Sequence, residues 1–132
     1  MAFAVTGELH VGVKDRPGEL AAVLKVVAGA GVDVRAFCAY SMEGSGTVMF
    51  VPSDAKKAKA ALKKAGYAKV GSTKVVVGAV KDTRGAGAKL TGRAAKAGVN
   101  LDYAYATGTG KGMGLVVLAA GKGTAKLLKA LT

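Results

Sequence analysis

The stretch Lys14–Val34, KDRPGELAAVLKVVAGAGVDV, recurs 67 residues later as Lys81–Leu101, KDTRGAGAKLTGRAAKAGVNL. Aligned without a gap, the two stretches share a Lys-Asp pair, a glycine three residues after the aspartate, and an Ala-Gly-Val run. The register continues downstream, where TVMFV at 47–51 lies over GLVVL at 114–118. A gapless internal match of this kind indicates two copies of one structural module.

The first copy contains patterns typical of both strands and helices. Residues 8–13, ELHVGV, alternate in polarity as a half-buried strand does. After the Asp-Arg-Pro-Gly turn, Leu20, Val23, Leu24 and Val27 fall on one helix face, and Pro17 suits the first helical position. We predict further strands at 32–40, 47–51, 67–74, 75–80, 99–107 and 113–119, and further helices at 53–65, 86–97 and 122–130.

This order of elements predicts an α+β fold with two ferredoxin-like βαββαβ modules in tandem, residues 1–73 and 74–132. Each module should have an antiparallel sheet with its helices on one face, and the second module lacks a last strand. Because that absence leaves an open sheet edge, we expect the apolar segment Ala2–Thr6 to help cover it. The alternation in the second strand predicts Cys38 in the core, and Ser53 is the expected cap of the helix after it.

Composition narrows the class of protein. The chain has 132 residues, of which 51% are hydrophobic and 21% charged, so a folded domain is expected and not a disordered chain. The single cysteine excludes an internal disulfide and a Cys-based zinc site. The sequence has neither a membrane-spanning apolar run nor a signal-peptide pattern, which predicts a cytoplasmic protein. No cofactor or metal is expected.

The net charge of +12 favours anionic partners such as nucleic acid, phosphates, carboxylates or an acidic protein. Five lysines lie on the helix expected from Ser53, where they serve either to solvate that helix or to contact phosphates. RNA-recognition modules share the ferredoxin-like topology and stack bases on aromatic residues of their central strands. Here the first strand has no aromatic residue and the third offers only Phe50, while Tyr40, Tyr103 and Tyr105 are expected in the core.

Enzymatic chemistry finds little support. His10 lies in an alternating strand with no evident catalytic partner in the sequence, and Asp102 is an isolated carboxylate. Residues 108–112, GTGKG, lack the spacing of a phosphate-binding P-loop and indicate a hairpin turn. We therefore predict a protein without catalytic activity.

The repeated turn has a chemistry of its own. A strand that enters a helix through a Pro-Gly turn leaves unpaired backbone N–H groups, and these groups with the helix dipole favour an anion such as a carboxylate. Gly18 allows close approach and Asp15 can accept hydrogen bonds from an ammonium group, so an α-amino acid would suit the turn. The alternative is purely structural, with Asp15 capping and Gly18 allowing packing.

A βαββαβ module with DRPGEL at 15–20 and AGAGVDV at 28–34 resembles the ACT domain, a small-molecule-sensing module of amino-acid metabolism. AGVNLDYAYA at 97–106 is similar to the second-strand segment of small stand-alone tandem ACT proteins. The resemblance covers about residues 8–131. It implies a non-catalytic regulatory protein, a homodimer or larger homo-oligomer, that binds an amino acid between ACT modules.

The ligand residues that the resemblance implies come from the turn and from the start of the second strand. The first copy supplies Asp15, Arg16, Pro17, Gly18, Glu19, Leu20 and Asp33, and the second supplies Asp82, Gly85 and Asn100. The copies differ, because Thr83-Arg84 replaces Arg16-Pro17 and Gly87 replaces Leu20. Asp33 stands where amino-acid-binding members often have asparagine, so either it meets an ammonium group and not a carboxylate, or its site is empty. The two sites are therefore expected to differ.

Overall fold

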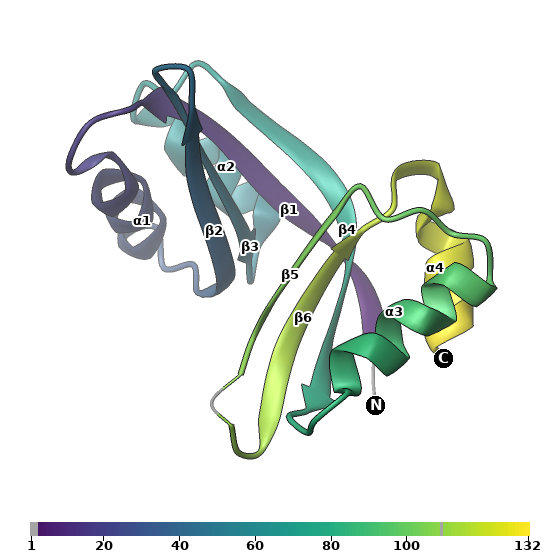
Figure 1. The fold of residues 1–132 in the computed structure, drawn as a ribbon. Helices are drawn as coiled ribbons and strands as arrows, with labels where there is room; N and C mark the ends of the chain where they lie inside the picture. The colour runs from purple at the N-terminus through teal and green to yellow at the C-terminus, as the bar shows by residue number, and fades with distance from the viewer. Residues whose placement is uncertain (1–2, 109) are drawn as a thin grey trace. The chain divides into compact units, whose positions relative to one another are not determined.

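The computed structural model describes residues 3–108 and 110–132 and shows an α+β fold (Figure 1). In the described residues, six strands form one antiparallel sheet in the order β2-β3-β1-β4-β6-β5, accompanied by four α-helices. The elements in chain order are β1 (Phe3–Lys14), α1 (Glu19–Gly29), β2 (Val34–Met42), β3 (Ser45–Pro52), α2 (Ala55–Lys64), β4 (Val70–Lys81), α3 (Ala86–Lys96), β5 (Tyr103–Thr107), β6 (Met113–Ala119), the 3-10 turn η1 (Gly121–Gly123) and α4 (Thr124–Leu131).

The chain divides into two compact units. The N-terminal unit is Gly7–Thr73, and the C-terminal unit is Lys74–Thr132 together with the first strand segment as far as Thr6. The division between the two units falls at Thr73–Lys74, and the described strand segment as far as Thr6 groups with the second half of the chain. β1 and β4 therefore each contribute residues to both units.

In the N-terminal unit, the core lies between the sheet and the paired helices α1 and α2. β1 pairs with β3 in an antiparallel register that sets Leu9 opposite Phe50 and Val11 opposite Val48. These four side chains point toward the helices, because all of them belong to one buried cluster. The helices complete that cluster with Val23, Val27, Ala58 and Leu62.

In the C-terminal unit, α3 and α4 pack against each other and cover one face of β4 and β6 (Figure 1). Phe3 joins this core with Val76, Leu90 and Leu118, and only 7% of its surface is exposed. Its ring occupies the space where Gly78 has no side chain. Phe3, which belongs to the segment expected to cover the open sheet edge, therefore packs in the core of this unit, whereas Ala2 lies outside the described residues.

Helix starts differ from the sequence prediction in two places. Pro17 does not open α1, because Gly18 is the N-cap residue and adopts a left-handed backbone with φ of 91°. Ser53 does not cap α2; the cap is Asp54, whose Oδ1 accepts a hydrogen bond from the Lys57 N–H at 3.0 Å. The Ser53 hydroxyl oxygen accepts instead from the Asp33 N–H, which ties the loop before β2 to the end of β3.

The second strand also differs. A register shift between Val34 and Ala36 against β3 turns Ala36, Cys38 and Tyr40 to the face opposite the helices, while Val34 still packs on the helix-side core. The core placement of Cys38 was therefore wrong, since its side chain is only half-buried. Tyr40 is 47% exposed, so it too lies outside the core.

Two predicted strands, 67–74 and 75–80, form the single strand β4. The β-branched residues Val75, Val76 and Val77 follow Lys74 directly, so no turn signal interrupts the extended backbone. In the part of the chain that the structure describes, no helix is long and apolar enough to cross a membrane.

Candidate functional site

The same backbone conformation opens the first helix of each unit. Gly18 and Gly85 are the N-cap residues of α1 and α3, with φ of 91° and 83°, and neither helix start has a side-chain cap. A positive φ favours glycine because a β-carbon is strained there. The repeated glycine predicted as a ligand contact is therefore required by the turn itself. As at every helix start, the first N–H groups have no intrahelical partners; in α3 one of them, the Ala86 N–H, donates to the Thr83 oxygen of the turn at 3.1 Å.

A cavity of about 210 Å³ adjoins this turn in the N-terminal unit. Four predicted ligand residues line it: Asp15, Arg16, Glu19 and Leu20. Arg16 Nε donates to Glu19 Oε1 at 2.8 Å, so the two charges at the mouth of this cavity neutralise each other. Pro17 and Gly18 shape the turn but do not line the cavity.

A matching cavity of about 190 Å³ adjoins the turn of the C-terminal unit. Its wall includes Lys81, Asp82, Thr83, Ala86 and Gly87, the repeat counterparts of residues that line the first cavity. The opposite wall comes from β5 and β6, as the first cavity's comes from β2 and β3. Each copy of the sequence repeat therefore has a cavity at the corresponding place.

Asp82 forms hydrogen bonds to the β5–β6 connection that the local sequence does not predict. Its Oδ2 accepts a hydrogen bond from the Gly110 N–H at 2.6 Å, and its own N–H donates to the Gly112 oxygen at 2.8 Å. These bonds anchor the β5–β6 connection, which is the hairpin turn predicted for residues 108–112, although Thr109 lies outside the described residues. Because the hairpin already uses part of the hydrogen-bonding capacity of the Asp82 carboxylate, only the remaining part can serve a ligand.

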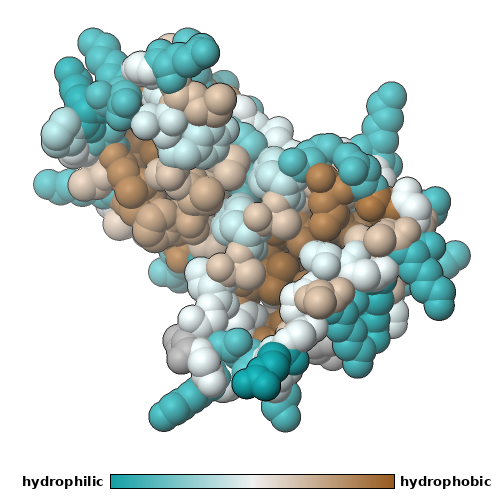
Figure 2. Space-filling model, viewed as in Figure 1, coloured by the Kyte–Doolittle hydropathy of each residue, from teal (hydrophilic) through white to brown (hydrophobic). Residues whose placement is uncertain are grey.

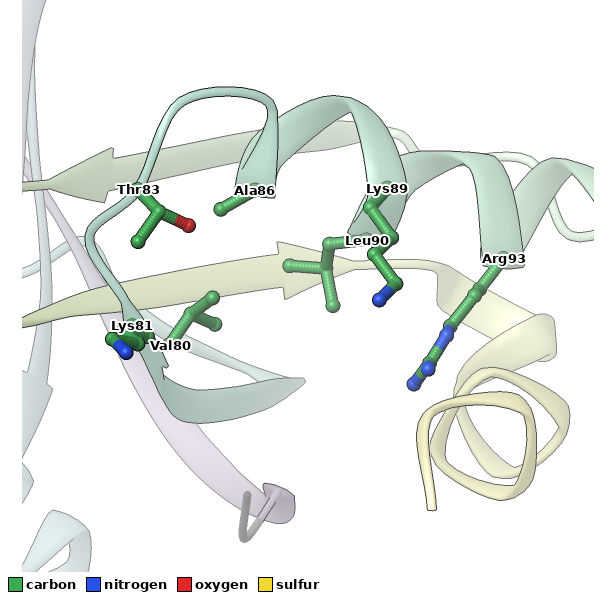
Figure 3. Close-up of a pocket in the computed structure, with 7 residues that line it drawn as sticks. All are labelled: Val80, Lys81, Thr83, Ala86, Lys89, Leu90 and Arg93. Atoms are coloured by element: carbon green, nitrogen blue, oxygen red, sulfur yellow. The ribbon is translucent and has the colours of Figure 1, made fainter.

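A third cavity, of about 170 Å³, lies along α3 (Figure 3). Val80, Ala86 and Leu90 give it an apolar floor. The basic side chains of Lys89 and Arg93 project from the same side of α3, and Lys81 lies at the end of β4 (Figure 3). Lys89 and Arg93 replace Ala22 and Val26 of the first repeat, so this cluster of positive charge belongs to the C-terminal unit alone.

The structure does not bring the remaining predicted residues to these turns within either unit. Asp33 N–H binds Ser53 at the end of β3, whereas Asp15 follows Lys14, which pairs with Ser45 at the start of β3. Seven residue steps of strand separate those ends, or about 23 Å at 3.3 Å per residue. Asn100 likewise precedes Asp102, whose N–H donates to Ala119 at the far end of β6 from Asp82.

His10 has an acidic neighbour that the sequence analysis missed. Its Nε2 lies 2.9 Å from Oε1 of Glu8, and Glu8 is fully buried. The two residues lie two positions apart on β1, so their side chains share one face of the strand. Glu8 and His10 follow the i, i+2 spacing that could have suggested this pair. Within the described residues, no group of three or more His, Cys, Asp or Glu side chains is placed to hold a metal ion.

The second wall of each turn cavity was not predicted from the sequence. Residues 39–41 and 46–48 supply it in the N-terminal unit, and Ala106, Thr107, Gly114 and Val116 do so in the C-terminal unit. The 67-residue register already placed TVMFV over GLVVL, so the repeat contained a signal for the β3 and β6 positions. These positions were not predicted as ligand contacts because their residues are small or uncharged.

Known proteins resemble the chain in structure. A protein from Bacteroides thetaiotaomicron aligns with a TM-score of 0.87 and 26% identity over 98% of this chain and 88% of its own. The regulatory subunit of aspartate kinase from Thermus thermophilus, in its ligand-free form, gives a TM-score of 0.68 and 20% identity over 98% and 93% of the two chains. The aspartokinase alpha and beta subunits give a TM-score of 0.69 and 22% identity over 99% and 95%.

Neither a protein-family model nor a curated protein matches the sequence. The structural likenesses nevertheless confirm the expected resemblance to the ACT domain at the level of the fold. The chain has the α+β fold of ACT-type regulatory domains, and its neighbours include regulatory subunits of aspartate kinase.

Proposed function

We propose that this protein is a non-catalytic regulatory protein that binds an amino acid or a related small metabolite at the turn before the first helix of its modules. The observation that carries the proposal is the repeated left-handed glycine cap, Gly18 and Gly85, with a cavity beside each turn. The uncapped helix start attracts a carboxylate, and the aspartate of each turn suits an ammonium group.

Three finer points belong to the same proposal. The two halves are tandem copies of one βαββαβ ACT-type module, with Phe3–Thr6 standing in for the last strand of the second. Asp33 and Asn100 reach a ligand only where a neighbouring module presents them, as the ACT resemblance implies. We further propose that the chain works as a homodimer or larger homo-oligomer, in which ligand binding changes how modules pack. The fold likeness to aspartate kinase regulatory subunits supports regulation over catalysis.

Binding of nucleic acid or an acidic protein remains the alternative. Its support is the exposed lysines of α2: Lys56, Lys57, Lys63 and Lys64. Stacking of bases on the sheet loses its only candidate in the third strand, because Phe50 is fully buried. The alternative would therefore depend on phosphate contacts alone.

The test is the thermal stability of the full chain against the twenty amino acids and common nucleotides. A ligand at about 100 times its dissociation constant should stabilise the native state by roughly 2.7 kcal/mol. Asp15 is exposed and lines the N-terminal cavity, so Asp15→Ala should weaken the response with little effect on folding. A flat response to every candidate would reject amino-acid sensing and leave a structural or protein-binding role.

A further inference from the structure

The two turn cavities differ in what lies behind them. In the C-terminal unit, the turn cavity adjoins a further cavity of about 240 Å³ between α3 and β5. The two cavities share the lining residues Gly87, Leu90, Ala106 and Val116. We call the cavity of about 240 Å³ the α3–β5 groove. It is lined by Gly87, Leu90, Thr91, Ala104, Tyr105, Ala106, Val116 and Leu118.

Small side chains open this groove. Gly87 lies on α3, and a β-carbon added there would meet nothing within 4 Å. Ala104 and Ala106 on β5 face the helix side of the sheet, since they pair with Leu118 and Val116. Apolar surface is visible over β5 and β6 beside α3 (Figure 2).

The first repeat provides the internal comparison. By the 67-residue register, Leu20 stands at the position of Gly87 and Phe37 at that of Ala104. Leu20 packs against the N-terminal core, so the corresponding space is filled. Thr83 and Ala86 stand at the positions of Arg16 and Glu19, which form an ion pair in the first repeat. The C-terminal cavity therefore has no ion pair at these two positions.

We infer that the turn cavity and the α3–β5 groove of the C-terminal unit together bind an amino acid with a branched aliphatic or aromatic side chain. The inference rests on the proposed function and names the ligand class for one of its two turns. Lys81, Asp82 and Thr83 at the turn suit the charged end of a zwitterion. The apolar residues of the α3–β5 groove receive the side chain.

The size of the groove agrees with this ligand. An apolar cavity of about 150 Å³ is large enough to bind benzene, so a space of about 240 Å³ holds a phenyl or isobutyl group. The polar end of the groove distinguishes an amino acid from a plain hydrocarbon.

The experiment is isothermal titration calorimetry of the full chain with leucine, phenylalanine, glycine, aspartate and lysine. Leucine or phenylalanine should bind at least about tenfold more tightly than glycine, because the groove removes their side chains from water. Gly87→Leu, which restores the residue of the first repeat, should weaken that binding by about tenfold or more.

Gly92→Leu is the matched control. Gly92 lies on the same helix, is exposed, has open space at its β-carbon position and lines none of the cavities described above. Its substitution should leave affinity unchanged. Leucine without its amino group, 4-methylpentanoate, should bind more weakly than leucine, which separates recognition of a zwitterion from simple filling of the groove.

The outcomes separate the two proposals. If amino acids bind but glycine, aspartate or lysine bind as well as leucine and phenylalanine, or if Gly87→Leu changes nothing, this inference is overturned and the proposed function stands. If Gly87→Leu and Gly92→Leu weaken binding equally, the groove is not the site and the inference is again overturned. If none of the five amino acids binds the unmodified chain, this inference is overturned, and the proposed function is decided by the stability screen against all twenty amino acids and the nucleotides.

Discussion

Gly18 and Gly85 lie 67 residues apart in the sequence and hold the same left-handed backbone, with φ of 91° and 83°. Each ends the turn after a strand and caps the helix that follows. Neither glycine is constrained by space, because a β-carbon at either position would meet nothing within 4 Å. The backbone conformation alone therefore explains why both copies of the turn contain glycine.

Replacing either cap glycine by alanine should destabilise the protein. A β-carbon in the left-handed region costs about 1–2 kcal/mol, so Gly18→Ala and Gly85→Ala should each lower the free energy of unfolding by that amount. Denaturant unfolding followed by circular dichroism provides the measurement. Gly92→Ala is the control, because this glycine lies inside α3 and alanine should stabilise the helix by about 1 kcal/mol. Equal effects at all three positions would contradict the role of backbone conformation.

Phe3 should be essential to the C-terminal unit. Phe3→Ala removes a buried ring from the core of Val76, Leu90 and Leu118, so we expect a loss of about 3–5 kcal/mol of unfolding free energy. Gly78→Ala should also destabilise, because a methyl group there meets the Phe3 ring. The control is Phe37→Ala, whose ring is 51% exposed and should cost far less. A Phe3→Ala protein as stable as the original would remove the first strand segment from the core.

The cap of α2 provides a third prediction. Asp54→Ala removes the carboxylate that accepts from the Lys57 N–H and should cost about 0.5–2 kcal/mol of unfolding free energy. Asp54→Asn keeps an acceptor and should recover most of that loss. Because Ser53 bonds to the Asp33 N–H instead, Ser53→Ala should leave the helical content of α2 intact. Loss of α2 with Ser53→Ala but not with Asp54→Ala would restore the original sequence-based assignment.

Any binding of single-stranded nucleic acid should be electrostatic. If the five lysines of α2 neutralise phosphates, affinity should fall by about 100-fold between roughly 50 and 200 mM salt. Fluorescence anisotropy with labelled oligonucleotides measures this, and pyrimidine and purine sequences should behave alike. Affinity that depends on sequence and resists salt would instead indicate recognition of bases.

Much of the architecture could be predicted from sequence because the repeat and the apolar periodicity report on burial. The positions of Leu20, Val23 and Val27 on one helix face correspond to packing against the observed core. Local signals placed β6 at its observed bounds, 113–119. The cost of an open sheet edge pointed to the segment that contains Phe3, although its packing in the core was not predicted.

The differences arose where nonlocal contacts decide the structure. The register shift that turns Cys38 away from the core is a property of how β2 pairs with β3, and alternation within one strand does not contain it. Ser53 and Asp54 are both good caps, and the choice between them depends on Asp33, twenty residues earlier. Similarly, only the folded hairpin shows that Asp82 binds Gly110.

The most direct test of amino-acid binding at the helix starts is a two-dimensional ¹H–¹⁵N correlation spectrum of the full chain during titration with leucine. We predict that the amide signals of residues 82–88, at the start of α3, shift in a saturable way, together with those of Ala104 and Ala106. The signals of Lys56–Lys64 in α2 should remain in place. A titration that leaves residues 82–88 and 15–21 unshifted, or that shifts only α2, would contradict the account.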